Sequence, residues 1–225
     1  MDFRLVILFG ITMIVSLFAQ SYVKSSYQKY SRIGTFRGMT GAQVAQYILD
    51  RNNLHDVTVI ESRGGVLSDH FDPMKNTVAL SKDVYHSASI ASVAVAAHEV
   101  GHAIQYATGY HGIKVRNILL KPTLVASQFS QVALIIGLIT SSFFLELGII
   151  MLAVIVLFQI ITLPIEFDAS SRALKIIEAE HIVDAGEYQG AKTMLNAAAL
   201  TYVAAALGSV VNLLYYIFLR NSRRD

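Results

Sequence analysis

Long apolar segments alternate with two polar regions along the chain. A helix needs about 20 apolar residues to cross a bilayer, and such segments occupy roughly Phe3–Val23 and Ala197–Leu219. The longer apolar run Leu124–Ile165 cannot be one straight span. Its break at "SSFFLELG", which contains Glu146, predicts a hairpin of two spans. The pattern therefore predicts four transmembrane helices, the first a retained anchor because "FAQSYV" is a poor signal-peptide cleavage site.

The two polar regions, residues 24–122 and 166–196, are expected on the same side of the membrane, because the hairpin crosses and returns. Lys and Arg residues near the spans are more numerous on this side than on the other. The positive-inside rule therefore favours a cytoplasmic location, although the C-terminal "RNSRRD" points the other way.

Within the first polar region, shorter patterns predict a small folded domain. The spacing of Val44 and Ile48 in "TGAQVAQYILDRNNL" predicts a helix with Thr40 as its N-cap. Three β-prone pieces, "VTVIES", "GGVLSDHF" and "NTVALS", are separated by the turn signals "RGG" and "DPMK" and predict a small antiparallel sheet. A further helix is expected from near Ser87 to Gly109. The predicted fold class is a mainly α membrane protein with a small α+β domain.

Composition supports a membrane protein and excludes several other classes. The chain is 54% hydrophobic and 15% charged, against about 25% charged in a typical soluble domain. It has no cysteine, which excludes disulfides and cysteine-based metal sites. A net charge of +2, with no nucleic-acid-binding motif and no Gly-rich phosphate loop, predicts no nucleic-acid partner. The lipid bilayer is the partner that composition indicates.

One apolar helix carries three polar side chains with the spacing of a metal site. In "VAVAAHEVGHAIQYATG", residues 93–109, His98 and His102 lie four apart and project from one helix face. Two imidazoles so placed can bind one zinc ion, while Glu99, about 100° around the helix, can act as a general base on water. The alternative is a helix with two partly buried histidines and a solvated glutamate, which would cost stability. The spacing therefore favours a zinc site.

A catalytic zinc needs a third protein ligand. One known spacing has a further histidine where Thr108 stands, so that arrangement is excluded. His111 lies beyond the expected helix end. Glu166 directly follows the third span and could face back toward the first helix. It could equally be an acid in the first turn of a helix that begins near Pro164, and composition leaves both readings open.

The motifs together resemble a known clan of enzymes. "HEVGH", a membrane hairpin and "EFDAS" resemble the gluzincin clan of zinc metallopeptidases, which includes the HtpX-like and CAAX prenyl proteases. More narrowly, "DHFDPMKNTVALS", "LPIEFDASSRAL" and "AAALTYVAAAL" resemble the bacterial YugP-type membrane zinc peptidases over nearly the whole chain. The resemblance implies a zincin-like catalytic domain with one zinc per chain, held by His98, His102 and Glu166, and Glu99 as the general base.

One position departs from the HtpX-like pattern. Those proteins tend to place an aspartate four residues after the ligand glutamate, where this chain has Ser170, and the nearby acid is Asp168. Which carboxylate would orient a zinc-bound histidine is therefore open.

The group that stabilises the oxyanion is assigned first to His181, in the helix after Glu166, and alternatively to His70, Tyr188 or Tyr202. A lone helical histidine is also commonly a surface residue. The strand "NTVALS" could take an extended peptide as an added strand if its edge is free, although it could also be an internal strand.

These features predict a membrane-anchored zinc endopeptidase with protein or peptide substrates, membrane proteins among them. One alternative is a non-catalytic membrane scaffold with a structural zinc site, but such a site needs ligands and no base, so Glu99 favours the enzyme. A transporter is disfavoured by the few intramembrane charges and the absence of repeated halves in the sequence.

The expected organisation is multi-pass in the cell membrane, with a cytoplasmic catalytic domain and cleavage at or just outside the membrane face. The predicted parts are an anchor (1–23), a zincin-like domain with the HExxH helix (24–122), the transmembrane hairpin (123–165), a helical segment that completes the metal site (166–196), and a last transmembrane helix with a basic tail (197–225).

Overall fold

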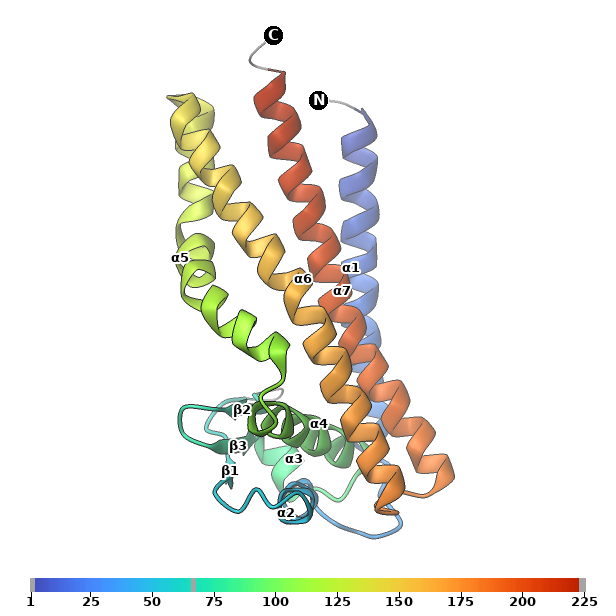
Figure 1. Ribbon diagram of the computed structural model, residues 1–225. Helices are drawn as coiled ribbons and strands as arrows, with labels where there is room; N and C mark the ends of the chain where they lie inside the picture. Colours follow the sequence, from blue (N-terminus) through green and yellow to red (C-terminus); the bar gives the residue numbers. More distant parts are fainter. Residues whose placement is uncertain (1–2, 66–67, 223–225) are drawn as a thin grey trace. The chain divides into compact units, whose positions relative to one another are not determined.

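The computed structural model describes residues 3–65 and 68–222, so Val66 and Leu67 of one predicted strand and the end of the basic tail lie outside it. The elements follow in the order α1 (Phe3–Tyr30), α2 (Gly41–Arg51), β1 (Thr58–Glu61), β2 (His70–Asp72), β3 (Thr77–Leu80), α3 (Lys82–His86), α4 (Ile90–Ala107), α5 (His111–Ile139), α6 (Ser142–Ala179) and α7 (Ala185–Asn221) (Figure 1). Within the described residues, four helices are long and apolar enough to cross a membrane: α1, α5, α6 and α7. The predicted class, a mainly α membrane protein with a small sheet, is confirmed.

The chain divides into two compact units. The helical unit comprises Met1–Gln20, His111–Pro164 and Leu200–Asp225, and the sheet unit comprises Ser21–Tyr110 and Ile165–Ala199. Because α1, α6 and α7 are continuous helices, each contributes residues to both units. Each unit has a hydrophobic core of its own.

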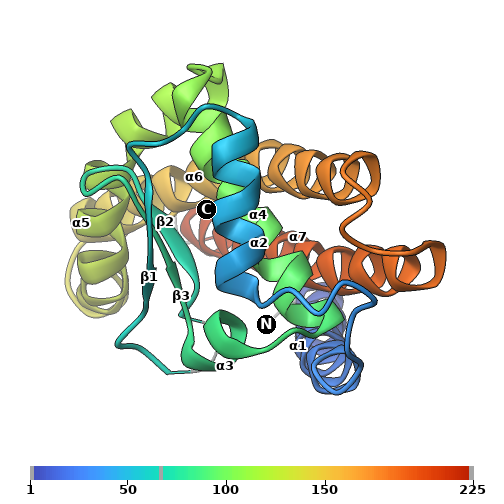
Figure 2. The same ribbon diagram turned by 90° about the horizontal axis from the view of Figure 1, so that it is seen from below.

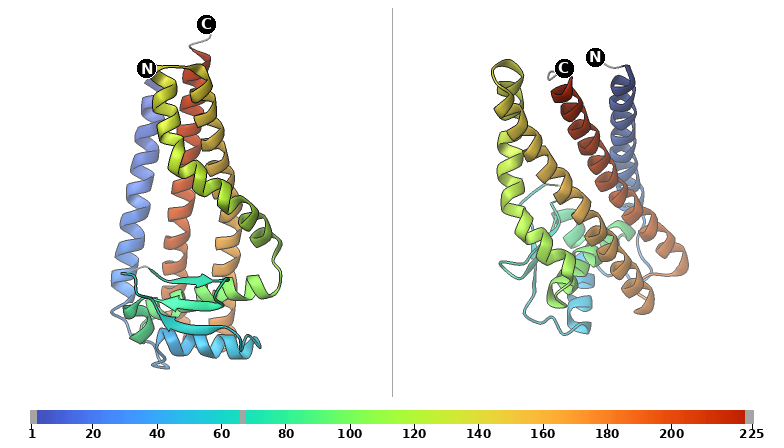
Figure 3. Two further views of the ribbon diagram at one scale, coloured as in Figure 1. Left: turned by 90° about the vertical axis from the view of Figure 1, so that its left-hand side faces the viewer. Right: turned by 45° about the horizontal axis from the view of Figure 1, so that its top comes forward.

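The helical unit contains the predicted hairpin, formed by α5 and the first part of α6. The two helices pack closely because glycines face their neighbours: a Cβ at Gly137 would lie 2.2 Å from the backbone nitrogen of Leu145, and one at Gly148 would lie 2.6 Å from the Leu134 side chain. The hairpin turn lies at the same end of this unit as the start of α1 and the end of α7 (Figures 1 and 3).

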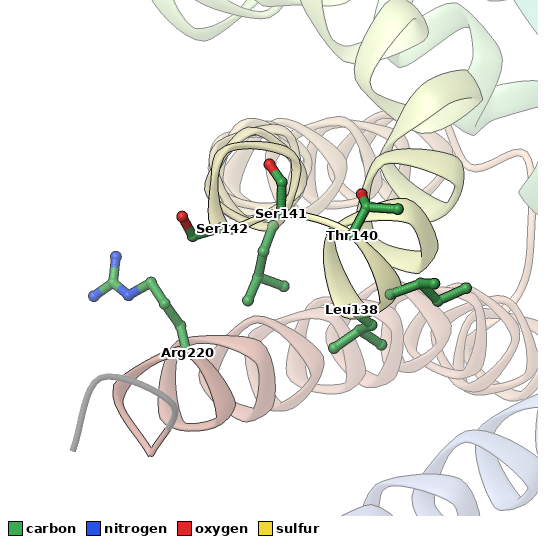
Figure 4. Close-up of a pocket in the computed structure, with 8 residues that line it drawn as sticks. Leu138, Thr140, Ser141, Ser142 and Arg220 are labelled. Carbon is green, nitrogen blue, oxygen red and sulfur yellow. The ribbon is translucent and has the colours of Figure 1, made fainter.

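A small cavity lies beside the hairpin turn in the helical unit. Its volume is about 210 Å³, and Figure 4 shows Thr140, Ser141 and Ser142 at the turn, with Arg220 on α7. Polar side chains thus gather where these helices end, as is typical where transmembrane helices leave the hydrocarbon.

The sheet unit is built around α4. In Figures 1 and 2, α4 lies between the sheet on one side and the sheet-unit parts of α6 and α7 on the other. Helix α2 begins as predicted, because Thr40 and Gln43 form a reciprocal capping box. Most of these elements contribute residues to the buried core. Examples are Ile48, Val78, Val100, Ile177 and Leu195.

The sheet is mixed, with the order β1-β3-β2. β1 pairs with β3 in parallel, and β2 pairs with β3 antiparallel. The prediction of an antiparallel sheet is therefore wrong for β1. Turn signals mark where strands end but not which strands pair. β3 is the central strand because it pairs with a strand on each side. Its residues Val78, Ala79 and Leu80 are buried, whereas β1 is mostly exposed.

Two further expectations change with the structure. Because β3 has a neighbour on each side, "NTVALS" is an internal strand, and the outer edges of the three-stranded sheet belong to β1 and β2. The helical segment expected over 166–196 is interrupted at residues 180–184, and α7 already begins at Ala185.

Candidate metal centre

Helix α4, which is largely buried, carries the predicted motif. It begins at Ile90, slightly later than expected, because the Ser89 side chain accepts a hydrogen bond from the Ser92 backbone and caps the helix. It ends before Gly109, whose φ of +65° suits a residue just past a helix end. His98 and His102 project from one face of the helix, with their rings edge to face and their centroids 4.7 Å apart.

Glycine within "HEVGH" allows α6 to approach this helix. A Cβ at Gly101 would lie 2.7 Å from the Ala169 carbonyl oxygen, closer than side chains tolerate. The two backbones therefore meet only because residue 101 has no side chain. This approach places Glu166, 5% exposed and one helical turn before Ala169, against the two histidines.

Three ligand atoms converge at this point. His98 Nε2 and His102 Nε2 lie 3.2 Å apart, and Glu166 Oε2 lies 3.4 Å from the first and 3.6 Å from the second. Ligands at 2.0–2.1 Å in a tetrahedral zinc site are about 3.3–3.4 Å from one another. Glu166 Oε2 is also buried and has no hydrogen-bond partner among the described residues. A cation would satisfy this buried acceptor, so the three residues fit a zinc ion.

The electrostatic environment also favours positive charge. Burial by itself lowers the pKa of His102, but the adjacent carboxylates of Glu166 and Glu99 outweigh burial and raise that pKa above its usual value. The side chain of Glu99 is buried, with 9% exposure, and leaves α4 directly after His98. The carboxylates around the two imidazoles therefore favour a cation at this position.

Each histidine ring has a neutral partner at Nδ1. The Ser170 hydroxyl lies 3.1 Å from His98 Nδ1, and Gln105 Oε1 lies 3.0 Å from His102 Nδ1. Asp168, which the sequence left as a candidate to orient a histidine, instead contacts Gln105 Nε2 at 2.8 Å. Sequence reasoning missed Gln105, although its position three residues after His102 on an otherwise apolar helix was a usable signal.

The structure does not bring His181 to this cluster. His181 is exposed just after α6, with a positive φ of 51°. The continuous helix between Glu166 and Ala179 spans about 20 Å at 1.5 Å per residue. His181 therefore lies too far from Glu166 to contact a carbonyl group held at the cluster.

The other residues considered for the oxyanion have different surroundings. His70 is exposed on β2, with Nδ1 2.8 Å from the Ser68 carbonyl oxygen. Tyr188 packs against the core of the sheet unit, whereas Tyr202 belongs to the helical unit. His111, which the sequence placed beyond the helix end in the search for a third ligand, also belongs to the helical unit.

The fold and this cluster define a class: a membrane protein with a candidate centre of two histidines and one glutamate, the ligand set of a catalytic zinc site. Residues 5–221 match the family described as "Putative neutral zinc metallopeptidase", and the chain belongs to that family. It is 43% identical over 212 residues to "Putative membrane protease YugP" of Bacillus subtilis (strain 168), covering 94% of each protein. No solved structure matches the chain.

Proposed function

We propose that the chain is a membrane-anchored zinc endopeptidase of the gluzincin type, with one zinc held by His98, His102 and Glu166. The observation that carries this proposal is the convergence of three candidate ligand atoms at 3.2–3.6 Å from one another, with Glu166 buried. Two come from α4 and the third from α6, and the family description names zinc and peptidase activity.

The reaction is hydrolysis of a peptide bond. Zinc, when bound, supplies a Lewis acid that polarises the scissile carbonyl and makes water more acidic. Glu99 accepts a proton from the attacking water and returns it to the leaving amine. Its place directly after His98 brings this carboxylate beside the ligands without making it one of them.

The substrates we propose are proteins or peptides, including membrane proteins, cleaved at or just outside the membrane face. The polar regions 24–122 and 166–196 form the catalytic part, and the basic residues near the spans favour a cytoplasmic location for it. A substrate that adds a strand to the sheet would pair with β1 or β2, the outer strands among the described residues.

The test compares purified full-length wild type with Glu99→Gln, using zinc analysis and cleavage of casein or a membrane protein. Glu180→Gln is a matched control, because it makes the same chemical change on a glutamate of the sheet unit that pairs with Arg51. We expect all three proteins to hold one zinc and Glu99→Gln to lose activity by about 10²–10⁴-fold. Equal cleavage by wild type and Glu99→Gln would overturn the enzyme proposal, and zinc with no cleavage by wild type would favour a structural zinc site.

A further inference from the structure

Gln105 is a completely buried amide next to the metal centre, with 0% exposure. Its oxygen Oε1 lies 3.0 Å from His102 Nδ1. Its nitrogen Nε2 donates to the Ile165 carbonyl oxygen at 2.9 Å and to Asp168 Oδ2 at 2.8 Å. Every polar atom of this side chain therefore has a partner, and all of the partners lie at or beside the candidate ligands.

The chemistry of these partners fixes the orientation of the amide. A backbone carbonyl and an ionised carboxylate can only accept hydrogen bonds, so the end of Gln105 that faces Ile165 and Asp168 must be the NH₂ group. The oxygen of Gln105 then faces His102 and can only accept, so Nδ1 of His102 carries the proton. In the neutral ring, this leaves a lone pair on Nε2, the atom that faces His98 and Glu166.

Asp168 is itself held in place. Its Oδ2 also accepts a hydrogen bond from Arg172 Nε at 2.6 Å, one helical turn along α6. The Arg172 guanidinium lies over the Tyr110 ring, 5.9 Å from its centroid. The Asp168 carboxylate therefore does not contact the His102 ring directly. The Gln105 amide lies between them and is hydrogen-bonded to both.

The other ligand histidine lacks such a connection. His98 Nδ1 contacts the Ser170 hydroxyl at 3.1 Å, and a hydroxyl can either donate or accept. Ser170 therefore does not dictate the tautomer of His98 as Gln105 dictates that of His102.

We propose that Gln105 is a positioning residue for the metal centre and that Asp168, held by Arg172, acts on His102 through it. This relay rests on the proposed function. It fixes the ligand tautomer of His102, and the bond to the Ile165 carbonyl holds α6 at the residue before Glu166. A carboxylate–amide–histidine relay thus takes the place of the direct carboxylate partner that the sequence left open.

The experiment measures zinc dissociation constants by chelator competition, with full-length wild type, Gln105→Leu and Asp168→Asn. Glu180→Gln is the control for Asp168→Asn, because both replace a carboxylate that accepts from an arginine. We expect Gln105→Leu and Asp168→Asn to weaken zinc binding by about 10–100-fold, as lost outer-shell contacts do. The control should bind zinc as wild type does. The visible absorption of the cobalt-substituted proteins should shift in the two relay variants only, which a purely structural tie between α4 and α6 would not cause.

Asp168→Asn removes the charge but keeps the shape of the side chain, and its amide oxygen can still accept hydrogen bonds. This variant keeps the test valid if Gln105→Leu does not fold.

Two results would overturn the relay while the proposed function stands. One is zinc binding by Gln105→Leu as tight as that of wild type, and the other is zinc binding by Asp168→Asn as tight as that of wild type. If wild type itself binds no zinc, the proposed function fails and the relay fails with it.

Discussion

The two units differ in the kind of polar side chain that they bury. In the helical unit, the buried polar side chains are hydroxyls, such as Thr123, Ser130 and Thr162, and large apolar side chains such as Ile118 and Ile139 are 74% and 79% exposed. In the sheet unit, carboxylates are buried: Glu99, Glu166 and Glu187 are each at most 9% exposed. Among the described residues, every buried carboxylate thus belongs to the sheet unit.

The difference follows from what surrounds each unit. Exposed apolar side chains are stable in contact with lipid, and a charge there would be costly, so the helical unit associates through close glycine contacts. A carboxylate buried in the sheet unit is stable only with hydrogen bonds, opposite charge or a cation. Glycine also has a different role in each unit: Gly137 allows two spans to pack closely, whereas Gly101 allows α6, which carries Glu166, to approach the two histidines of α4.

The largest effect is expected from Glu166→Ala, which removes the buried carboxylate of the cluster. Zinc affinity should fall by more than the roughly 100-fold that a lost outer-shell contact causes, because a ligand itself is gone. Chelator competition on the purified protein measures this. Glu146→Ala, a glutamate of the helical unit, is the comparison, and zinc affinity equally reduced by both changes would contradict the assignment of Glu166.

Gly101→Ala should have the next largest effect. The added Cβ would lie 2.7 Å from the Ala169 carbonyl oxygen, so α4 and α6 must separate. Overpacking of this kind costs about 1–3 kcal/mol, and the separation also moves Glu166 away from the histidines. Both the melting temperature in detergent and the zinc affinity should fall. Unchanged zinc affinity would mean that this close approach does not set the geometry of the cluster.

Gly137→Ala should destabilise the helical unit without weakening zinc binding. Its Cβ would lie 2.2 Å from the Leu145 backbone nitrogen, so a cost of about 1–3 kcal/mol is again expected. Gly208→Ala is the matched control, because no atom lies within 4 Å of a Cβ there. The measurement is the melting temperature in detergent, with zinc affinity in parallel. A loss of zinc affinity in Gly137→Ala would show that the two units are not independent in this respect.

The smallest effect is expected at an exposed contact of the sheet unit. Hydrogen bonds from Arg51 and Tyr47 hold the pKa of Glu180 below its usual value of 4.5. A lowered carboxylate pKa stabilises the fold above the unfolded pKa, and that stabilisation is lost as the pH falls through the folded pKa. Glu180→Gln should therefore melt slightly below wild type at pH 7, and the difference should vanish in acid below that pKa. A difference independent of pH would exclude the charge as its cause.

The sequence by itself determined the four apolar helices, the capped helix after Thr40 and the HExxH helix. These depend on local periodicity, on capping side chains and on spacing along one helix, which need no distant partner. It also brought Glu166 into consideration, because a hairpin returns the chain to the side of the membrane from which it left. The two candidate ligand histidines are local in the same sense, since four residues make about one helical turn.

Only the tertiary structure decided which strands pair, where His181 lies and which side chains contact the two candidate ligand histidines. The mixed sheet depends on the burial of β3 between β1 and β2, which turn signals do not encode. His181 lies beyond the reach of the cluster because α6 continues unbroken to Ala179. The contact of Gln105 with Asp168 joins residues 63 positions apart. Such contacts arise from the packing of α4 against α6, and no local pattern specifies that packing.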